Sequence, residues 1–170
     1  MIRDMIRNVP DFPSAGVMFR DITTVLKDPA GLRLAVDEMA RVLEGVEFDL
    51  VLGPESRGFI FGVPLAYKFG KGFVPARKSG KLPAETAKKA YALEYGEAVI
   101  EIHKDAIKPG SKVVLVDDLL ATGGTAKAVA DLVRELGASV SAMAFLIELA
   151  PLGGREALAG YENVKSVLVY

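Results

Sequence analysis

The sequence predicts an α/β fold, a doubly wound and mainly parallel sheet in one domain spanning residues 1–170. Short apolar runs rich in Val, Leu and Ile alternate with longer segments whose apolar residues recur at helical spacing. Two of these runs, 48–52 and 113–116, lead directly into polar, glycine-containing loops that precede a helical segment. Because ligands bind at the carboxyl ends of parallel strands, these two loops are the predicted site.

Composition excludes several classes of function. The formal net charge is -1 and Lys and Arg are dispersed, so nucleic acid is not a predicted partner. The chain has no Cys, which excludes disulfides and thiolate chemistry. No apolar run is long enough to span a membrane, and residues 1–7 lack the apolar core of a signal peptide. We therefore expect a cytoplasmic protein that does not bind a membrane.

The first part of the chain predicts a helix before Pro10, an irregular loop and a second helix. Four apolar residues would share one face of the first helix: Ile2, Met5, Ile6 and Val9. Residues 10–23 contain two prolines and a glycine, which disfavour regular structure, yet the loop is apolar. Such a loop either packs on the core or covers a ligand. Asp28 and Pro29 are typical of a helix start, and we expect this helix to end at Glu44.

The rest of the chain continues the alternation of strands and helices. The strand at 48–52 and its loop precede a helix that ends at Phe69, and the polar, basic composition of 77–90 predicts a surface loop that includes Lys88 and Lys89. The other predicted elements are strands at 72–76, 139–149 and 164–170, a hairpin at 91–103 with its turn near Gly96, and helices at 125–136 and 153–158. His103 is the only histidine, so we expect a structural role for it.

The loop at 117–124 combines two kinds of chemistry. The small residues of 121–125 let backbone N–H groups approach a ligand, and the helix start adds the positive end of its dipole, which favours a phosphate. Asp117 and Asp118 would repel a phosphate unless they faced hydroxyl groups or a metal ion. A ribose 5-phosphate suits both the acid pair and the loop of small residues. The alternative is that this segment is an ordinary strand-to-helix connection whose acids cap the helix. P-loop and dinucleotide motifs are absent.

The loop after the earlier strand carries Arg57, the residue type best suited to grip phosphate oxygens in pairs. A single arginine in a loop is usually a solvated surface residue. In a parallel sheet, however, this loop would lie beside 117–124. Arg57 is then a candidate for holding a second anionic group.

The sequence Val-Asp-Asp-Leu-Leu-Ala-Thr-Gly-Gly-Thr at 116–125 resembles the phosphoribosyl-pyrophosphate (PRPP) motif of type I phosphoribosyltransferases. It is similar to the form of this motif in the family's adenine enzymes. The resemblance covers Pro10 to about Glu156. It implies transfer of the 5-phosphoribosyl group from PRPP to adenine, giving AMP and pyrophosphate in purine salvage. It places Asp117 and Asp118 on the ribose hydroxyls. It assigns the 5-phosphate to Ala121, Thr122, Gly123, Gly124 and Thr125.

The resemblance also implies a pyrophosphate site and a mobile lid and flap at about 77–103. The pyrophosphate residues would be Glu55, Ser56, Arg57, Arg77, Lys78 and Lys81, the last three reaching the ligand when the lid closes. Family members often hold a non-proline cis peptide in the first of these loops. We expect one at Glu55–Ser56 or Ser56–Arg57.

For the base, the resemblance implies a hood at 10–23 over adenine. It suggests contacts from Val17, Met18, Phe19, Arg20 and Leu149. Leu93–Gly96 matches the family's Leu-Glu-Tyr-Gly signature, which makes Glu94 the candidate proton acceptor. The alternative for Glu94 is the exposed face of a strand. Ala121 stands where the hypoxanthine and guanine relatives carry an aspartate that handles the base proton.

The resemblance further implies Mg²⁺ as cofactor, held by substrate oxygens and water without a direct protein ligand, and a homodimer. Arg57 and Glu94 are the predicted catalytic residues. Two other functions fit the residues. One is a transferase for another purine, and the other is a regulator that binds PRPP without chemistry.

Overall fold

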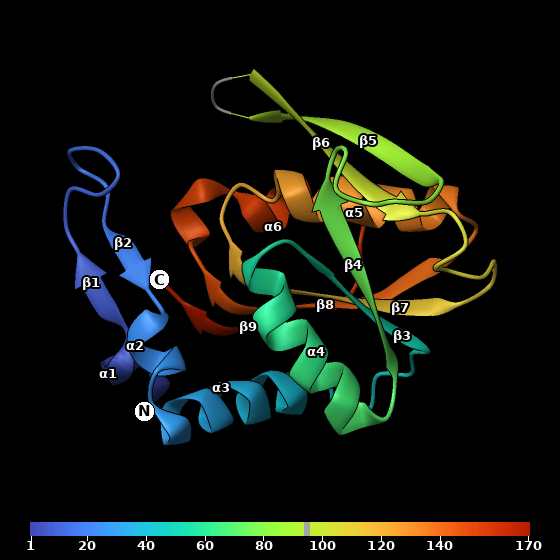
Figure 1. Cartoon of the computed structure of the whole chain (residues 1–170). Helices are drawn as coiled ribbons and strands as arrows, with labels where there is room; N and C mark the ends of the chain where they lie inside the picture. Colours follow the sequence, from blue (N-terminus) through green and yellow to red (C-terminus); the bar gives the residue numbers. More distant parts are fainter. Residues whose placement is uncertain (94–95) are drawn as a thin grey trace.

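The computed structural model describes residues 1–93 and 96–170, and it confirms the α/β fold (Figure 1). Within these residues a seven-stranded sheet has the order β5-β6-β4-β3-β7-β8-β9. Its parallel part consists of β4 (Gly72–Lys78), β3 (Leu50–Pro54), β7 (Lys112–Leu120), β8 (Ser139–Glu148) and β9 (Val164–Val169). The hairpin of β5 (Thr86–Leu93) and β6 (Gly96–His103) joins the sheet antiparallel to β4.

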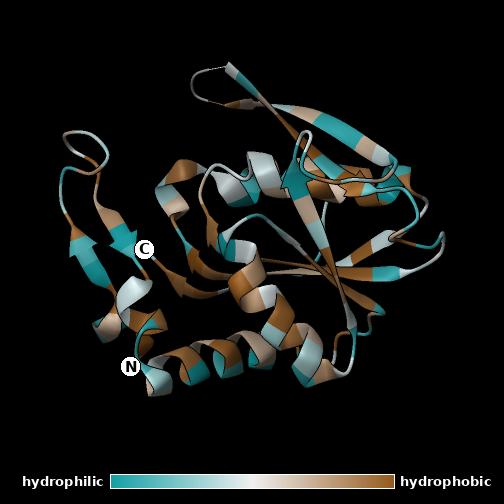
Figure 2. Ribbon diagram, in the orientation of Figure 1, coloured by the Kyte–Doolittle hydropathy of each residue, from teal (hydrophilic) through white to brown (hydrophobic). Residues whose placement is uncertain are grey.

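Helices cover both faces of the sheet. Figure 1 shows α3 (Pro29–Val42) and α4 (Arg57–Phe69) on one side and α5 (Gly124–Glu135) on the other. Successive side chains of β7 enter opposite layers of the core: Val113 packs in the cluster with α5, and Val114 packs in the cluster with α3 and α4. Figure 2 shows the same pattern as apolar central strands with polar outer helix faces. Strand β7 is therefore buried on both faces, as its apolar run predicted.

The boundaries of α3 follow the predicted start signals. The side chain of Asp28 accepts a hydrogen bond from the backbone N–H of Gly31 at 2.7 Å, and Pro29 is the first helical residue. The helix ends at Val42, ahead of the predicted end at Glu44.

None of the described helices is both long and apolar enough to cross a membrane.

The N-terminal segment differs from the prediction. The first helix, α1 (Ile2–Met5), is shorter than expected, and Val9 belongs instead to strand β1 (Arg7–Val9). The supposedly irregular loop contains β2 (Phe19–Asp21), which pairs antiparallel with β1, and a short helix α2 (Thr23–Leu26) follows. The apolar spacing suggested a helix because it carries no information about the distant strand that pairs with β1.

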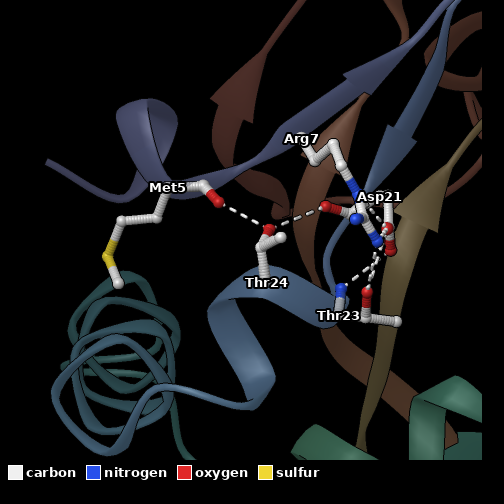
Figure 3. A network of polar contacts seen from close by, with 5 residues as sticks. All are labelled: Met5, Arg7, Asp21, Thr23 and Thr24. Carbon is white, nitrogen blue, oxygen red and sulfur yellow. Dashed lines mark hydrogen bonds and ion pairs between the residues drawn. The ribbon is translucent and has the colours of Figure 1, made fainter.

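A polar network joins these N-terminal elements (Figure 3). The carboxylate of Asp21 accepts hydrogen bonds from Arg7 Nε at 2.9 Å and from the backbone N–H of Thr23 at 2.9 Å. The hydroxyl of Thr24 donates to the carbonyl of Met5 at 2.6 Å. The backbone bond from Thr23, together with Arg7, lowers the pKa of Asp21 from 3.8 to about 2. Asp21 therefore connects β1, β2 and α2 in its ionised form.

We expect Asp21→Asn to destabilise the protein by about 1 to 2 kcal/mol at pH 7. Because the folded state lowers the pKa of Asp21, the stabilisation is present above the ordinary value of 3.8 and is lost as the pH falls through about 2. Urea denaturation of both proteins between pH 7 and pH 2 checks this. Asp4→Asn, at an exposed carboxylate, is the control. A difference that stayed constant as the pH fell would contradict the role of the charge.

Two further boundaries correct the predictions. Strand β7 continues past 113–116 to Leu120, so Asp117 and Asp118 lie in the strand and the loop begins at Ala121. The strand is longer because β8 supplies a parallel partner up to the pair Leu120 and Glu148. Of the expected loop at 77–90, residues 86–90 belong to β5 and residues 77–78 belong to β4.

The two lysines of that segment are also not simply solvated. Lys88 Nζ lies 2.9 Å from Oε1 of buried Glu101, and Lys89 Nζ lies 2.5 Å from Glu135 Oε1. His103 Nε2 accepts a hydrogen bond from the backbone N–H of Ala84 at 3.3 Å, which ties the preceding loop to the hairpin. These contacts connect β5 with β6 and with α5.

Candidate active site

A cavity of about 360 Å³ opens at the carboxyl ends of β3 and β7. The direction of winding reverses here, because β4 lies on one side of β3 and β7 on the other. Ligands bind at such a position in doubly wound sheets. The predicted site residues that line the cavity are Glu55, Ser56, Arg57, Lys78, Asp117, Asp118, Ala121, Thr122, Gly123, Gly124 and Thr125.

The two acids of β7 form a tightly placed pair. The backbone N–H of Asp118 donates to Asp117 Oδ1 at 2.8 Å, and Arg57 Nε lies 2.7 Å from Asp118 Oδ2. Burial raises the pKa of Asp117 well above its ordinary value, and the neighbouring charge of Asp118 adds to the effect. Burial also raises the pKa of Asp118, against the opposing effect of Arg57. Hydroxyl donors or a cation at this pair would favour its ionised form.

The loop of small residues ends in the start of α5. Gly123, which precedes the helix, has a φ of 82°, a left-handed conformation that favours glycine. Its carbonyl accepts a hydrogen bond from the N–H of Lys127 at 2.8 Å. The N–H groups of the first helical turn have no acceptor within the helix, so they are available to an anion in the cavity.

The loop after β3 supplies the second charged group. The Glu55–Ser56 peptide bond is cis, which confirms the expectation for this loop. Glu55 Oε1 accepts hydrogen bonds from Arg77 Nε at 3.1 Å and from the backbone N–H of Lys78 at 2.9 Å. Arg77 is therefore paired with an acid at the rim. Arg77 and Lys81 do not belong to the cavity lining, whereas Lys78 does.

Comparison with known proteins decides the family. The profile described as "Phosphoribosyl transferase domain" matches residues 22–167. The adenine phosphoribosyltransferase of Agathobacter rectalis is 59% identical, over 99% of this chain and 97% of its own. The crystal structure of adenine phosphoribosyltransferase from Thermoanaerobacter pseudethanolicus gives a TM-score of 0.96 at 54% identity, covering 99% of this chain and 98% of that one. The chain belongs to the adenine phosphoribosyltransferases.

A solved relative in this family has a ligand bound. Adenine phosphoribosyltransferase from Saccharomyces cerevisiae is complexed with an imino-altritol bisphosphate and adenine. It is 40% identical, has a TM-score of 0.92, and the match covers 98% of this chain and 96% of that chain. The type I phosphoribosyltransferase fold expected from the resemblance is thus confirmed.

The predicted hood, residues 10–23, exposes the apolar side chains at its tip. Phe12, Val17 and Met18 are 51%, 42% and 45% exposed, so they do not pack on the core. Phe19 makes an edge-to-face contact with Phe12, with ring centroids 5.1 Å apart. Of the two interpretations of this loop, packing on the core therefore does not hold for its tip. Apolar side chains left in solvent are typical of a surface that covers a ligand.

The hood and the cavity are separate in this conformation. None of the four predicted hood residues, nor Leu149, belongs to the cavity lining. Leu149 is nevertheless attached to the cavity wall, because its N–H donates to the carbonyl of Leu120 at 2.9 Å. Glu94 lies outside the described residues.

The cavity also contains residues that the sequence interpretation missed. They are Tyr91, Ile100, Leu119, Leu120 and Ala126. The hydroxyl of Thr125 donates to Tyr91 Oη at 3.2 Å, so β5 reaches the phosphate loop. The available signal was the period-two pattern of β5, which places Tyr91 on the same face as Ala87 and Lys89.

The start of α6 (Gly154–Ala157) lies directly behind the phosphate loop. A Cβ added at Gly154 would lie 2.3 Å from the carbonyl oxygen of Ala121, and one added at Gly123 would lie 2.7 Å from the carbonyl oxygen of Gly154. These two backbone segments are packed too closely for a side chain at either position. The position of the loop therefore depends on α6.

We expect Gly154→Ala to raise the KM for PRPP about tenfold, because overpacking of about 1 to 3 kcal/mol would displace the phosphate loop. The KM for adenine should change little. Steady-state kinetics check this against Gly160→Ala, where the added Cβ meets nothing within 4 Å. A folded Gly154→Ala protein with an unchanged KM for PRPP would show that α6 does not position the loop.

Proposed function

We propose that the protein transfers the 5-phosphoribosyl group of PRPP to adenine, giving AMP and pyrophosphate in purine salvage. The observation that carries the proposal is one cavity that joins a buried acid pair to a loop of small residues at a helix start. The acid pair suits the diol of a ribose, and the loop of small residues suits a phosphate. The adenine bound in the yeast relative supports the choice of base.

In this proposal Asp117 and Asp118 accept hydrogen bonds from the ribose hydroxyls. The backbone of residues 121–125, with the Thr122 and Thr125 hydroxyls, binds the 5-phosphate. The raised pKa values of the acids support their role, since hydrogen-bond donors from a diol would offset the cost of burying their charge. PRPP would therefore bind with its ribose fixed at both ends.

Pyrophosphate would lie near Glu55, Ser56, Arg57 and Lys78. Arg77 and Lys81 would join them from the lid within residues 77–103. In the structure Arg77 Nε lies 3.1 Å from Glu55 Oε1, so a contact with pyrophosphate would use the Nη groups of the guanidinium. A closed lid excludes water, which protects the oxocarbenium-like centre from hydrolysis.

The acid pair also fits Mg²⁺ as a cofactor. Carboxylates and substrate oxygens are the ligands that Mg²⁺ prefers, and the described residues contain no group of three or more potential metal ligands. In our proposal Asp117 and Asp118 would hold the ion indirectly, through substrate oxygens and water. The chemistry that bound Mg²⁺ supplies is neutralisation of charge on the departing pyrophosphate.

For the base we propose Glu94 as the proton acceptor. The bond between ribose C1 and the pyrophosphate oxygen breaks, a nitrogen of adenine forms the new bond to C1, and the proton of that nitrogen passes to the carboxylate. Val17, Met18, Phe19 and Arg20 would cover the ring, with Leu149 on its face.

We also propose a homodimer. Val63 and Tyr67 lie one turn apart on α4 and are 50% and 89% exposed, so this helix presents two neighbouring apolar side chains that a second copy could cover. Sedimentation velocity tests the proposal, and a monomer at micromolar concentration would contradict it. The cytoplasmic location stays a prediction.

The choice of base is tested by turnover with PRPP and each of adenine, hypoxanthine, guanine and xanthine. We expect adenine to have the highest kcat/KM, by a factor of at least about 10³, because a site built to hydrogen-bond one base leaves its polar groups unpaired with another. A preference for a different purine would overturn the assignment to adenine and leave the PRPP half of the proposal standing.

A further inference from the structure

We infer that Tyr170 is a positioning residue for the adenine site, joining the hood to the segment that carries Leu149. The inference rests on the proposed function. The backbone of Tyr170 contacts both neighbours of Leu149. The N–H of Tyr170 donates to the carbonyl of Glu148 at 2.9 Å, and the carbonyl of Tyr170 accepts from the N–H of Ala150 at 3.0 Å.

The side chain of the same residue reaches the hood. The guanidinium carbon of Arg20, on β2, lies over the Tyr170 ring at 4.1 Å from its centroid. Arg3, beside the hood, lies over the ring at 4.3 Å and donates from Nη2 to the carbonyl of Val169 at 2.8 Å. Figure 1 shows this end of the chain, marked C, beside β2. The ring therefore attracts two cations, one of them on the hood strand.

Arg20 has few other contacts that could fix it. Its Nη1 donates to Asn8 Oδ1 on the neighbouring strand β1, which pairs with β2. Its Nε is buried and has no hydrogen-bond partner among the described residues. The Tyr170 ring thus ties the Arg20 side chain to the C-terminal strand. Because the Arg20 side chain contacts the Tyr170 ring, the backbone of Arg20 is the part that would contact adenine.

One residue then sets the distance between the two walls of the base site. The backbone of Tyr170 holds the Leu149 wall, and its ring holds the hood wall. Loss of the ring removes this link between β2 and the Leu149 segment without touching the PRPP residues around 117–125. The base site and the PRPP site should consequently respond differently to a change at Tyr170.

The test compares the kinetics of Tyr170→Ala, Tyr170→Leu and Tyr170→Phe, with Val169→Ala as the neighbouring control. The Ala and Leu variants should raise the KM for adenine roughly tenfold and leave the KM for PRPP within about twofold. Tyr170→Phe keeps the aromatic ring, so its KM for adenine should equal that of the wild type. Tyr170→Leu keeps the apolar bulk, so the test stands if the Ala variant does not fold.

A double variant sharpens the test. Arg20→Leu alone should raise the KM for adenine by a similar factor, and Arg20→Leu with Tyr170→Leu should raise it no further. The inference is overturned if the KM for adenine is unchanged in Tyr170→Leu, or if the KM values for adenine and PRPP rise equally. It is also overturned if Tyr170→Phe does not have the wild-type KM for adenine, or if the effects of the two substitutions multiply in the double variant.

Hydrogen exchange separates this inference from the proposed function. Amides of residues 19–21 should exchange faster in Tyr170→Leu than in the wild type or Tyr170→Phe, whether or not the protein turns over adenine. Lack of turnover by the wild type would refute the proposed function alone. Unchanged exchange at 19–21 would refute the role of Tyr170 alone.

Discussion

Replacing both acids of β7, Asp117→Ala with Asp118→Ala, should weaken PRPP binding by about 10²-fold or more. Each hydrogen bond from a ribose hydroxyl to a charged carboxylate contributes about 1.5 to 3 kcal/mol. The loss of two such bonds therefore reaches at least that factor. Titration calorimetry with PRPP and Mg²⁺ measures it, and Asp37→Ala, a half-exposed acid on α3, is the control.

The same double variant carries an expected change in stability. Burial raises the pKa of both acids, so the folded state binds more protons than the unfolded state above their ordinary pKa. The wild type should lose stability as the pH rises from about 4 into the raised range, and the variant should lack this slope. Unchanged PRPP affinity with an unchanged pH dependence would remove both acids from the proposed site.

Glu94→Ala should lower kcat by about 10²- to 10⁴-fold, the usual contribution of a general base or acid. The affinity for PRPP should stay within about twofold, because the proposed contacts of PRPP come from other residues. Stopped-flow or steady-state turnover, with the PRPP dissociation constant measured separately, checks the split. Glu97→Ala, at an exposed glutamate of β6, is the matched control.

A general-base role also predicts dependence on pH. The low-pH limb of the kcat profile of the wild type should be absent from Glu94→Gln, since the amide cannot take the proton. Turnover of Glu94→Ala equal to that of the wild type would rule out the carboxylate as the proton acceptor at the base.

The parts of the fold that depend on local pattern were predictable. The apolar run at 113–116 and the helical spacing after Thr125 predicted β7 and α5, and the neighbouring placement of the two loops followed from a parallel sheet. The resemblance added the cis peptide at Glu55–Ser56, which composition could not suggest. The strand and the helix agree with the prediction because the local spacing of apolar residues determines them.

The parts that depend on distant partners were not predictable. Strands β1 and β2 pair Arg7 with Asp21, and the apolar spacing of β1 contains no sign of this. The end of β7 was placed too early because β8, not hydrophobicity, extends it through Asp117 and Asp118. The pairing of Arg77 with Glu55 likewise depends on the register of β3 against β4, which brings Pro54 beside Ala76.

The most direct test of the proposed reaction is phosphorus NMR of the protein with PRPP, adenine and Mg²⁺. The proposed function predicts that PRPP disappears and that AMP and pyrophosphate appear in equal amounts. Release of ribose 5-phosphate in place of AMP would show hydrolysis rather than transfer. PRPP that binds and stays intact would contradict the proposed reaction and would favour a PRPP-binding regulator.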